Sequence, residues 1–226
     1  MMKAVIKLLL ILLASVYFYS CEKDKLETVT DFDGNVYNTV RIGTQIWMAE
    51  NLKTTKFNDG TDIPLVTDYS EWGNLTSPGY CWYNNDKYTY GGIYGALYNW
   101  YTVNTGKLCP EGWHVPSDVE WNVLENYLGG ETVAGGKLKE AGTEHWEYPN
   151  TGATNVSGFT ALPGSGRYQS EMFTEIGFFG NWWSSSQEDQ GFPYSVYRNL
   201  TYFDGGIYWG GSGISDGLSV RCIKDK

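Results

Sequence analysis

The stretch CPEGWHVPSDVEW, residues 109–121, decides how this chain is interpreted, because it holds a thiol, an imidazole and three carboxylates within thirteen residues. Ser117 followed three residues later by Glu120 is a capping box, in which each side chain accepts a hydrogen bond from the other residue's backbone N–H. Trp121 then stands at the fourth helical position, where it packs back toward Pro116. The stretch therefore predicts the start of a helix, with its carboxylates used for capping.

The predicted helix has one apolar face and a clear end. Apolar residues recur at helical spacing, and Gly129-Gly130 is typical of a glycine C-cap. The residues expected on the buried face are Trp121, Leu124, Tyr127 and Leu128.

A second helix is predicted over residues 94–103. This segment places Leu97, Trp100 and Tyr101 at positions i, i+3 and i+4, and Gly106 follows it. Such spacing gives one apolar face on a helix.

The rest of the chain has the pattern of short strands joined by tight turns. Residues 36–42 alternate in polarity and are separated by Gly43 from an apolar run over residues 46–48, which predicts a β-hairpin. Residues 80–84 and several segments after Gly158 are further short strands between Gly, Asp and Asn turns. We therefore predict one α+β domain over residues 31–226, with short strands, two helices, and Gly- and aromatic-rich loops.

The first twenty residues have the pattern of a lipoprotein signal peptide. Lys3 and Lys7 precede an apolar run over residues 8–19 that is too short to span a bilayer, and Cys21 follows. Acyl chains such as palmitate on Cys21 would anchor the protein stably in a membrane. Residues 21–30 are then a tether, and a plain secretory signal or an uncleaved anchor is the alternative.

The charge of the chain excludes polyanions as partners. After removal of residues 1–20, which hold two lysines and no acids, 14 basic and 26 acidic residues remain, a formal charge of −12. Because nucleic acid and anionic lipid are bound through Lys and Arg, no nucleic-acid partner is expected.

Three cysteines remain if Cys21 carries lipid. Thiols outside the cytoplasm tend to pair, and the pairing we prefer joins Cys109 to Cys222, leaving Cys81 as a buried free thiol. The alternative is a catalytic Cys109 with His114 as its base. The five-residue spacing between them does not by itself bring the two side chains together.

No catalytic or metal-ligating motif is found. The two histidines, His114 and His145, have no zinc-type spacing, so neither a metal nor a cofactor is predicted. A pair of catalytic carboxylates for glycoside hydrolysis remains an alternative, because folding brings such residues together and they need no fixed spacing in the sequence. The candidates for that pair are Glu171, Glu188 and Asp189.

Aromatic residues make up 16% of the chain, and exposed rings can stack on sugars. The ligand-binding candidates lie in strand segments near Gly-rich loops: Asn181, Trp182, Trp183, Tyr202, Tyr208 and Trp209. Because alternate residues of a strand point to opposite faces, at most one of Trp182 and Trp183 is expected to face a ligand.

Eight ordered motifs resemble the Fibrobacter succinogenes major paralogous domain over about residues 30–226. They are IGTQIWMAENLKT, NDGTDIP, YCWYNND, YGALYNWYTV, LCPEGWHVPSDVEW, GFTALPGSGRY, WWSSS and LSVRCIKD.

HVPSDVEW and the terminal SVRC are also similar to segments of formylglycine-generating enzymes. That resemblance implies a C-type-lectin-like fold, in which the chain termini pair as neighbouring strands and Cys109 lies close to Cys222. It implies no activity, because the C-x-x-x-x-C that would match the copper-binding cysteine pair of those enzymes is absent. The E-P-N, Q-P-D and W-N-D motifs of calcium-dependent lectins are absent as well.

These observations predict a lipid-anchored, extracytoplasmic, non-catalytic binding domain of the outer membrane, on its periplasmic or surface face. The membrane, through Cys21, and a glycan or an envelope protein are the expected partners. The alternatives are an enzyme related to the formylglycine-generating oxidases, a glycan-active hydrolase, and a structural envelope protein.

Overall fold

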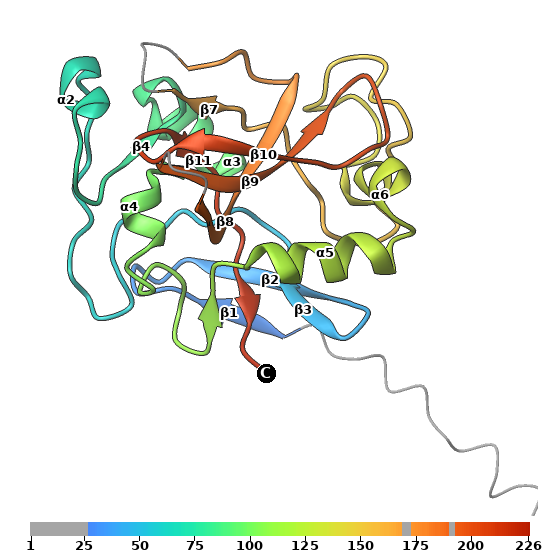
Figure 1. Cartoon of the computed structure of the whole chain (residues 1–226), viewed down its shortest axis with the longest axis horizontal. Helices are drawn as coiled ribbons and strands as arrows, with labels where there is room; N and C mark the ends of the chain where they lie inside the picture. The colour runs from blue at the N-terminus through green and yellow to red at the C-terminus, as the bar shows by residue number, and fades with distance from the viewer. Residues whose placement is uncertain (1–26, 169–172, 190–192) are drawn as a thin grey trace, which may run out of the picture.

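The computed structural model describes residues 27–168, 173–189 and 193–226, which form a mixed α/β domain with mostly antiparallel strands (Figure 1). The predicted signal peptide and Cys21 lie outside these residues, as does Glu171.

A five-stranded antiparallel sheet holds both ends of the described chain. Its order is β1-β2-β3-β12-β6, and its strands are β1 (Thr28–Thr30), β2 (Val36–Ile42), β3 (Gln45–Met48), β12 (Ile223–Lys224) and β6 (Trp113–His114). The β2–β3 hairpin confirms the predicted one. The terminal strands β1 and β12 share the sheet but are separated by that hairpin, so they are not the neighbours that the resemblance implied.

The predicted tether ends earlier than expected. Residues Thr28–Thr30 pair with β2, and the side chain of Val29 packs against the hydrophobic core. Strand β1 therefore begins three residues before the predicted domain boundary at residue 31.

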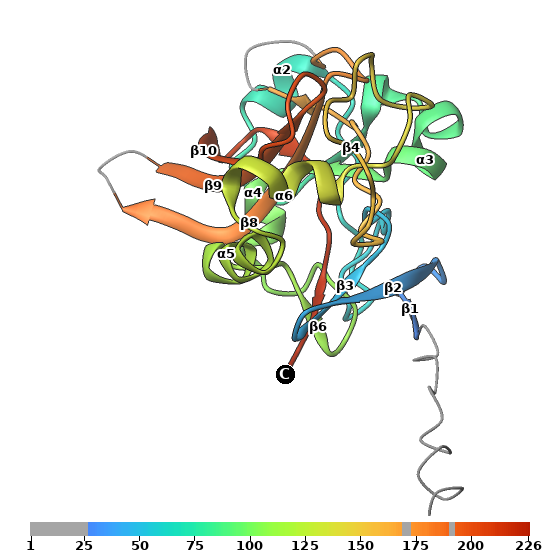
Figure 2. The same cartoon turned by 90° about the vertical axis from the view of Figure 1, so that its right-hand side faces the viewer.

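Two further antiparallel sheets complete the strands. One has the order β4-β5-β11-β7, with β4 (Tyr80–Trp82), β5 (Ala96–Tyr98), β11 (Gly217–Leu218) and β7 (Gly166–Arg167). The other has the order β10-β9-β8, with β10 (Tyr208–Gly213), β9 (Pro193–Thr201) and β8 (Phe179–Asp189). Figure 2 shows β8 and β9 reaching out from the body of the domain, with β10 beside β9.

The helix predicted from the opening stretch is confirmed as α5 (Asp118–Tyr127), with both hydrogen bonds of the capping box. Trp121, Leu124 and Leu128 are buried as predicted, but the Tyr127 side chain is 65% exposed. The ring of Tyr127 instead lies outside the core over Gly43, in the β2–β3 turn.

The helix predicted over residues 94–103 is wrong. Gly95 has a φ of 78°, outside the right-handed helical region, and Ala96–Tyr98 pair with β4 as strand β5. After Gly95 the predicted range is helical only in α4 (Trp100–Val103), which begins where the side chain of Asn99 accepts a hydrogen bond from the backbone N–H of Thr102.

The other helical segments were not predicted. The longest is α6 (Glu131–Leu138), whose paired glycines Gly135 and Gly136 touch backbone carbonyls of neighbouring loops. The remaining ones are α2 (Tyr69–Gly73), α3 (Gly92–Tyr94), a 3₁₀ turn (Tyr83–Asn85) and a π turn (Lys87–Gly91).

Two large hydrophobic clusters form the core, and a disulfide joins the segments that build it. Cys109 and Cys222 are bonded, as predicted, with Cα atoms 6.0 Å apart. The bond connects the segment before β6 to the segment before β12, and both sulfurs belong to the cluster that also holds Trp183. Trp182 belongs to the other cluster.

Candidate functional site

The predicted residues on β8 lie in the interior. Asn181, Trp182 and Trp183 are all buried. The Trp183 indole Nε1 donates to the carbonyl oxygen of Tyr98 at 2.7 Å, and the Trp182 Nε1 donates to Oδ1 of Asn51 at 2.8 Å. Alternation sends the two indoles to opposite faces, as predicted, but each face is covered by a core cluster. Neither indole is therefore on a surface where a ligand could stack on it.

The predicted residues on β10 do lie on the surface. Trp209 is 60% exposed and Tyr208 is 39% exposed. The chain has ten tryptophans, and the other nine are buried. Trp209 is thus the one tryptophan that the fold leaves in solvent.

The strand register places a second exposed ring on the same face as Trp209. Trp209 is opposite Arg198 on β9, Gly211 is opposite Val196, and Gly213 is opposite Tyr194. Directly opposed residues share a face, so Tyr194, which is 51% exposed, lies on the Trp209 side of the sheet. We call Tyr194, Gly211 and Trp209 the aromatic face.

Gly211 lies on the aromatic face between Trp209 and Tyr194 and has no side chain to cover the backbone there. A Cβ added to Gly211 would lie only 3.2 Å from the Cβ of Tyr194, so any larger residue would push against the tyrosine. The glycine leaves the backbone accessible between Tyr194 and Trp209.

Sequence analysis did not identify Tyr194 as a ligand-binding candidate. The signal was present in the alternation of Tyr194, Val196 and Arg198, which continues the same face by one more residue.

The other candidates on this part of the chain point elsewhere. Tyr208 lies on the opposite face of β10, and its hydroxyl donates to Oδ2 of Asp204 at 3.1 Å. Tyr202 is half-buried, with its ring 5.0 Å from Phe178 and 5.4 Å from Phe203, measured between centroids. Neither ring extends the aromatic face.

A buried arginine beside the aromatic face has its charge compensated. Arg198 is opposite Trp209, and its Nη1 lies 2.6 Å from Oδ1 of Asp118 at the start of α5. Its Nε lies 3.9 Å from Oε2 of Glu125, and its Nη2 donates to Oδ1 of Asn122. Arg198 therefore fixes α5 on the sheet and offers no uncompensated charge to a ligand.

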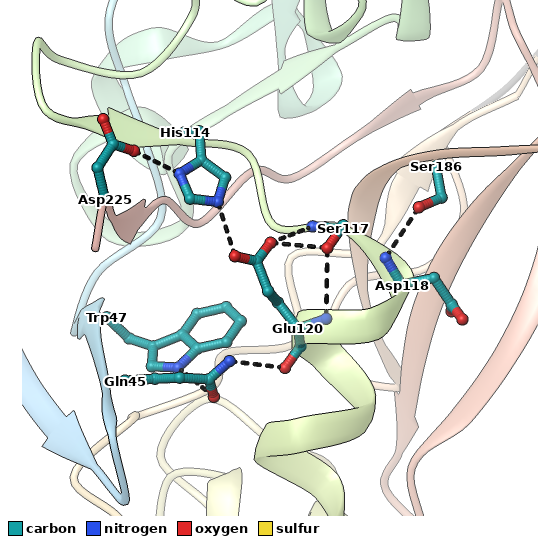
Figure 3. A network of polar contacts seen from close by, with 8 residues as sticks. All are labelled: Gln45, Trp47, His114, Ser117, Asp118, Glu120, Ser186 and Asp225. Carbon is teal, nitrogen blue, oxygen red and sulfur yellow. Dashed lines mark hydrogen bonds and ion pairs between the residues drawn. The ribbon is translucent and has the colours of Figure 1, made fainter.

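The opening stretch forms a structural network rather than a nucleophile and base (Figure 3). Cys109 is in the disulfide, so the catalytic alternative for Cys109 and His114 is wrong. His114 lies between two carboxylates, with Nδ1 2.5 Å from Oδ1 of Asp225 and Nε2 2.9 Å from Oε1 of Glu120. The other oxygen of Glu120 accepts from the backbone and hydroxyl of Ser117. One imidazole thus joins β6, the last residues of the chain and the start of α5.

This network makes stability depend on pH. Burial alone would lower the pKa of His114, but hydrogen bonds to Asp225 and Glu120 and the charges of both raise it above its ordinary value. Stabilisation by protonated His114 is therefore present below the unfolded pKa of about 6.5 and is lost as pH rises through the folded pKa.

We expect the free energy of unfolding to fall as the pH rises above about 6.5, because His114 gives up its stabilising proton as the pH passes through its raised folded pKa. In a His114→Gln variant this fall is expected to be smaller. Urea unfolding at several pH values measures both slopes. An equal slope in the variant would contradict the assignment.

Among the described residues, one group of side chains has metal-ligand spacing, namely Glu140, Glu144 and His145, whose ligand atoms all lie within 4.8 Å of one another. Nδ1 of His145 lies 2.9 Å from Oε1 of Glu140. This hydrogen bond accounts for the arrangement of His145 and Glu140 without an ion.

Cys81 is buried and unpaired, as predicted. Burial raises the pKa of its thiol to about 12, with opposing effects from the charge and hydrogen bond of Arg167. It is therefore protonated at neutral pH and is not a nucleophile. Within the ranges that the structure describes, no helix is both long and apolar enough to cross a bilayer.

A family comparison agrees with the motifs. The model of the Fibrobacter succinogenes major domain matches residues 40–224. No curated protein and no solved structure matches the chain significantly.

Proposed function

This chain belongs to the Fibrobacter succinogenes major domain family, and we propose that it is a lipid-anchored, extracytoplasmic, non-catalytic binding domain whose aromatic face contacts a glycan. The anchor is acylated Cys21, and the location is the outer membrane.

The exposure of Trp209 carries this proposal. Burying a large apolar side chain stabilises a fold by roughly 1.5 to 3 kcal/mol, and an exposed tryptophan forgoes that stabilisation. This chain buries nine tryptophans and exposes the tenth on a strand that is paired with β9. Tryptophan and tyrosine are enriched in binding hot spots, and here one exposed residue of each kind lies on the same face of the sheet.

The chemistry of the aromatic face favours a neutral, flat-faced ligand. Sugar rings present C–H groups that stack on aromatic faces, and Gly211 leaves room for a ring to approach the backbone between Tyr194 and Trp209. Because Arg198 is neutralised by Asp118 and Glu125, no unpaired charge on it selects an ionic ligand.

A C-type-lectin-like fold is part of the same proposal. Two observations support it, namely the presence of both ends of the described residues in one sheet and the disulfide between Cys109 and Cys222. This likeness concerns the fold alone and transfers no activity. The alternative functions are a protein ligand, a structural role in the envelope, and an enzyme related to the formylglycine-generating oxidases or to glycan hydrolases.

A glycan-array screen of the protein, with and without calcium, tests the proposal. We expect saturable binding to a defined set of glycans. An empty array from a folded, disulfide-bonded protein would overturn the glycan ligand and favour a protein partner.

Oxidative footprinting is expected to locate the ligand. In the free protein Trp209 should be oxidised much faster than the nine buried tryptophans, and saturation with an array-selected glycan should slow its oxidation several-fold. Trp209 is the only tryptophan in its tryptic peptide, residues 199–221, so mass spectrometry of that peptide measures its oxidation separately from the others. Unchanged oxidation of Trp209 in the bound protein would contradict the assigned face.

A further inference from the structure

Strand β10 has an open edge. Among the strands that the structure describes, β10 pairs only with β9, and it lies at the rim of the three-stranded sheet (Figure 2). Its pairing with β9 is regular over six consecutive residues without a bulge. A regular edge presents a row of backbone N–H and C=O groups that suits one further strand.

The other ends of the sheets are protected in ways that β10 is not. The edge strands β1, β4, β6 and β7 are only two or three residues long. The outer side of β8 is partly covered, because Gly180 bridges to Ser165 and Trp182 bridges to Ser219. Short strands and covered edges are usual defences against edge pairing.

The sequence of β10 carries no such defence. It reads YWGGSG, without a charged residue or a proline. Lysine, proline and inward-pointing charges are the usual means of blocking an edge. At the end of the strand the N–H of Gly213 is already bonded to Oδ2 of Asp216, whereas the residues from Tyr208 to Ser212 include no charged residue and no proline.

The strand is also complementary to itself. If two copies of β10 run antiparallel with Gly210 opposite Gly210, then Trp209 faces Gly211 of the second copy and Tyr208 faces Ser212. Each aromatic side chain thus lies opposite a residue with little or no side chain. Aromatic residues across from glycine stabilise sheet edges, and an uncharged strand brings no like charges together.

We propose that two copies of this chain pair through β10 in an antiparallel register centred on Gly210, which joins the two three-stranded sheets into one of six strands. A twofold axis perpendicular to the sheet keeps both aromatic faces on one side. Trp209 of each copy then lies near Tyr194 of the other, across Gly211. The pairing does not depend on what the aromatic face binds.

Light scattering of the full chain in detergent tests the oligomeric state. We expect the protein mass of two copies for the natural sequence and of one copy for Gly210→Asp, which places two carboxylates directly opposite each other. Val156→Lys, at an exposed position outside the three-stranded sheet, should remain a dimer. A monomeric natural sequence, or a dimeric Gly210→Asp variant, would overturn the proposal.

Cysteine cross-linking tests the register even if Gly210→Asp fails to fold. A Gly210→Cys thiol should form an intermolecular disulfide under mild oxidation, since directly opposed Cα atoms lie about 5 Å apart. The added Cβ requires only a shift of the outer ring atoms of Tyr197. Tyr208→Cys is the matched control, because its two copies would be separated by four residues of strand, about 14 Å, and should not link.

Cross-linking of Tyr208→Cys in preference to Gly210→Cys, or of neither, would overturn the register. Gly210 lies on the face of β10 opposite Trp209, so Gly210→Asp should leave the aromatic face intact. If the monomeric variant still binds a glycan, dimerisation and glycan binding are separate properties. The failure of one proposal would then not imply the failure of the other.

Discussion

Replacing both disulfide cysteines, Cys109→Ala with Cys222→Ala, is expected to lower the free energy of unfolding by roughly 5 kcal/mol. The bond spans a sequence separation of 113 residues, and closing a loop of that length removes about this much chain entropy from the unfolded state. Typical domains are stable by only about 5 to 15 kcal/mol, so the variant should lose about a third or more of its stability and unfold at a much lower urea concentration.

Urea unfolding followed by tryptophan fluorescence measures the loss. Cys81→Ala is the control, since it removes the third thiol and leaves the bond intact; it should cost about 1 kcal/mol for one buried sulfur. A loss below about 2 kcal/mol in the double variant would show that the strands hold Cys109 and Cys222 together without the bond.

Trp183→Ala is expected to cost about 3 to 5 kcal/mol of folding stability. The indole is fully buried in the larger core cluster. Its removal leaves a cavity and deletes the hydrogen bond that its Nε1 donates to the carbonyl oxygen of Tyr98. The same substitution at Trp209 should change stability by less than about 1 kcal/mol, because that side chain is on the surface.

Thermal and urea unfolding of the Trp183→Ala and Trp209→Ala variants show which of the two side chains is in the core and which is on the surface. A stable Trp183→Ala protein that loses only ligand binding would contradict the burial of Trp183. The expected result has a practical consequence, since loss of binding in Trp183→Ala would report unfolding rather than a lost ligand contact.

Features with local causes could be predicted from the sequence. Helix α5 follows from Ser117 and Glu120, whose capping bonds form within one helical turn. The β2–β3 hairpin follows from its alternating strand and Gly43. The pairing of Cys109 with Cys222 could be preferred because only three cysteines follow the predicted lipidation site at Cys21.

Features that depend on tertiary contacts could not be predicted. The apolar spacing over residues 94–103 is typical of a helix, but pairing with β4 and the φ of Gly95 override it. Helix α6 contains Gly135 and Gly136, which weaken helices locally and are needed because backbone carbonyls of Gly206 and Gly152 approach them.

The candidate site shows the same division. Alternation along β8 shows that Trp182 and Trp183 face opposite ways, but it cannot show that β8 lies between two core clusters. The partner of Trp209 on the aromatic face is Tyr194, and only the register between β9 and β10 brings them to one face.

The central claim is that a glycan is bound on the aromatic face. The most direct test is calorimetric titration of one array-selected glycan into three proteins: the natural sequence, the Trp209→Ala variant and the Tyr208→Ala variant. The two substitutions change neighbouring exposed aromatics that point to opposite faces of β10. We expect Kd to rise at least about 30-fold in Trp209→Ala, the effect of losing a hot-spot tryptophan worth about 2 kcal/mol, and to stay within about threefold in Tyr208→Ala. Equal affinities for Trp209→Ala and the natural protein would contradict the claim.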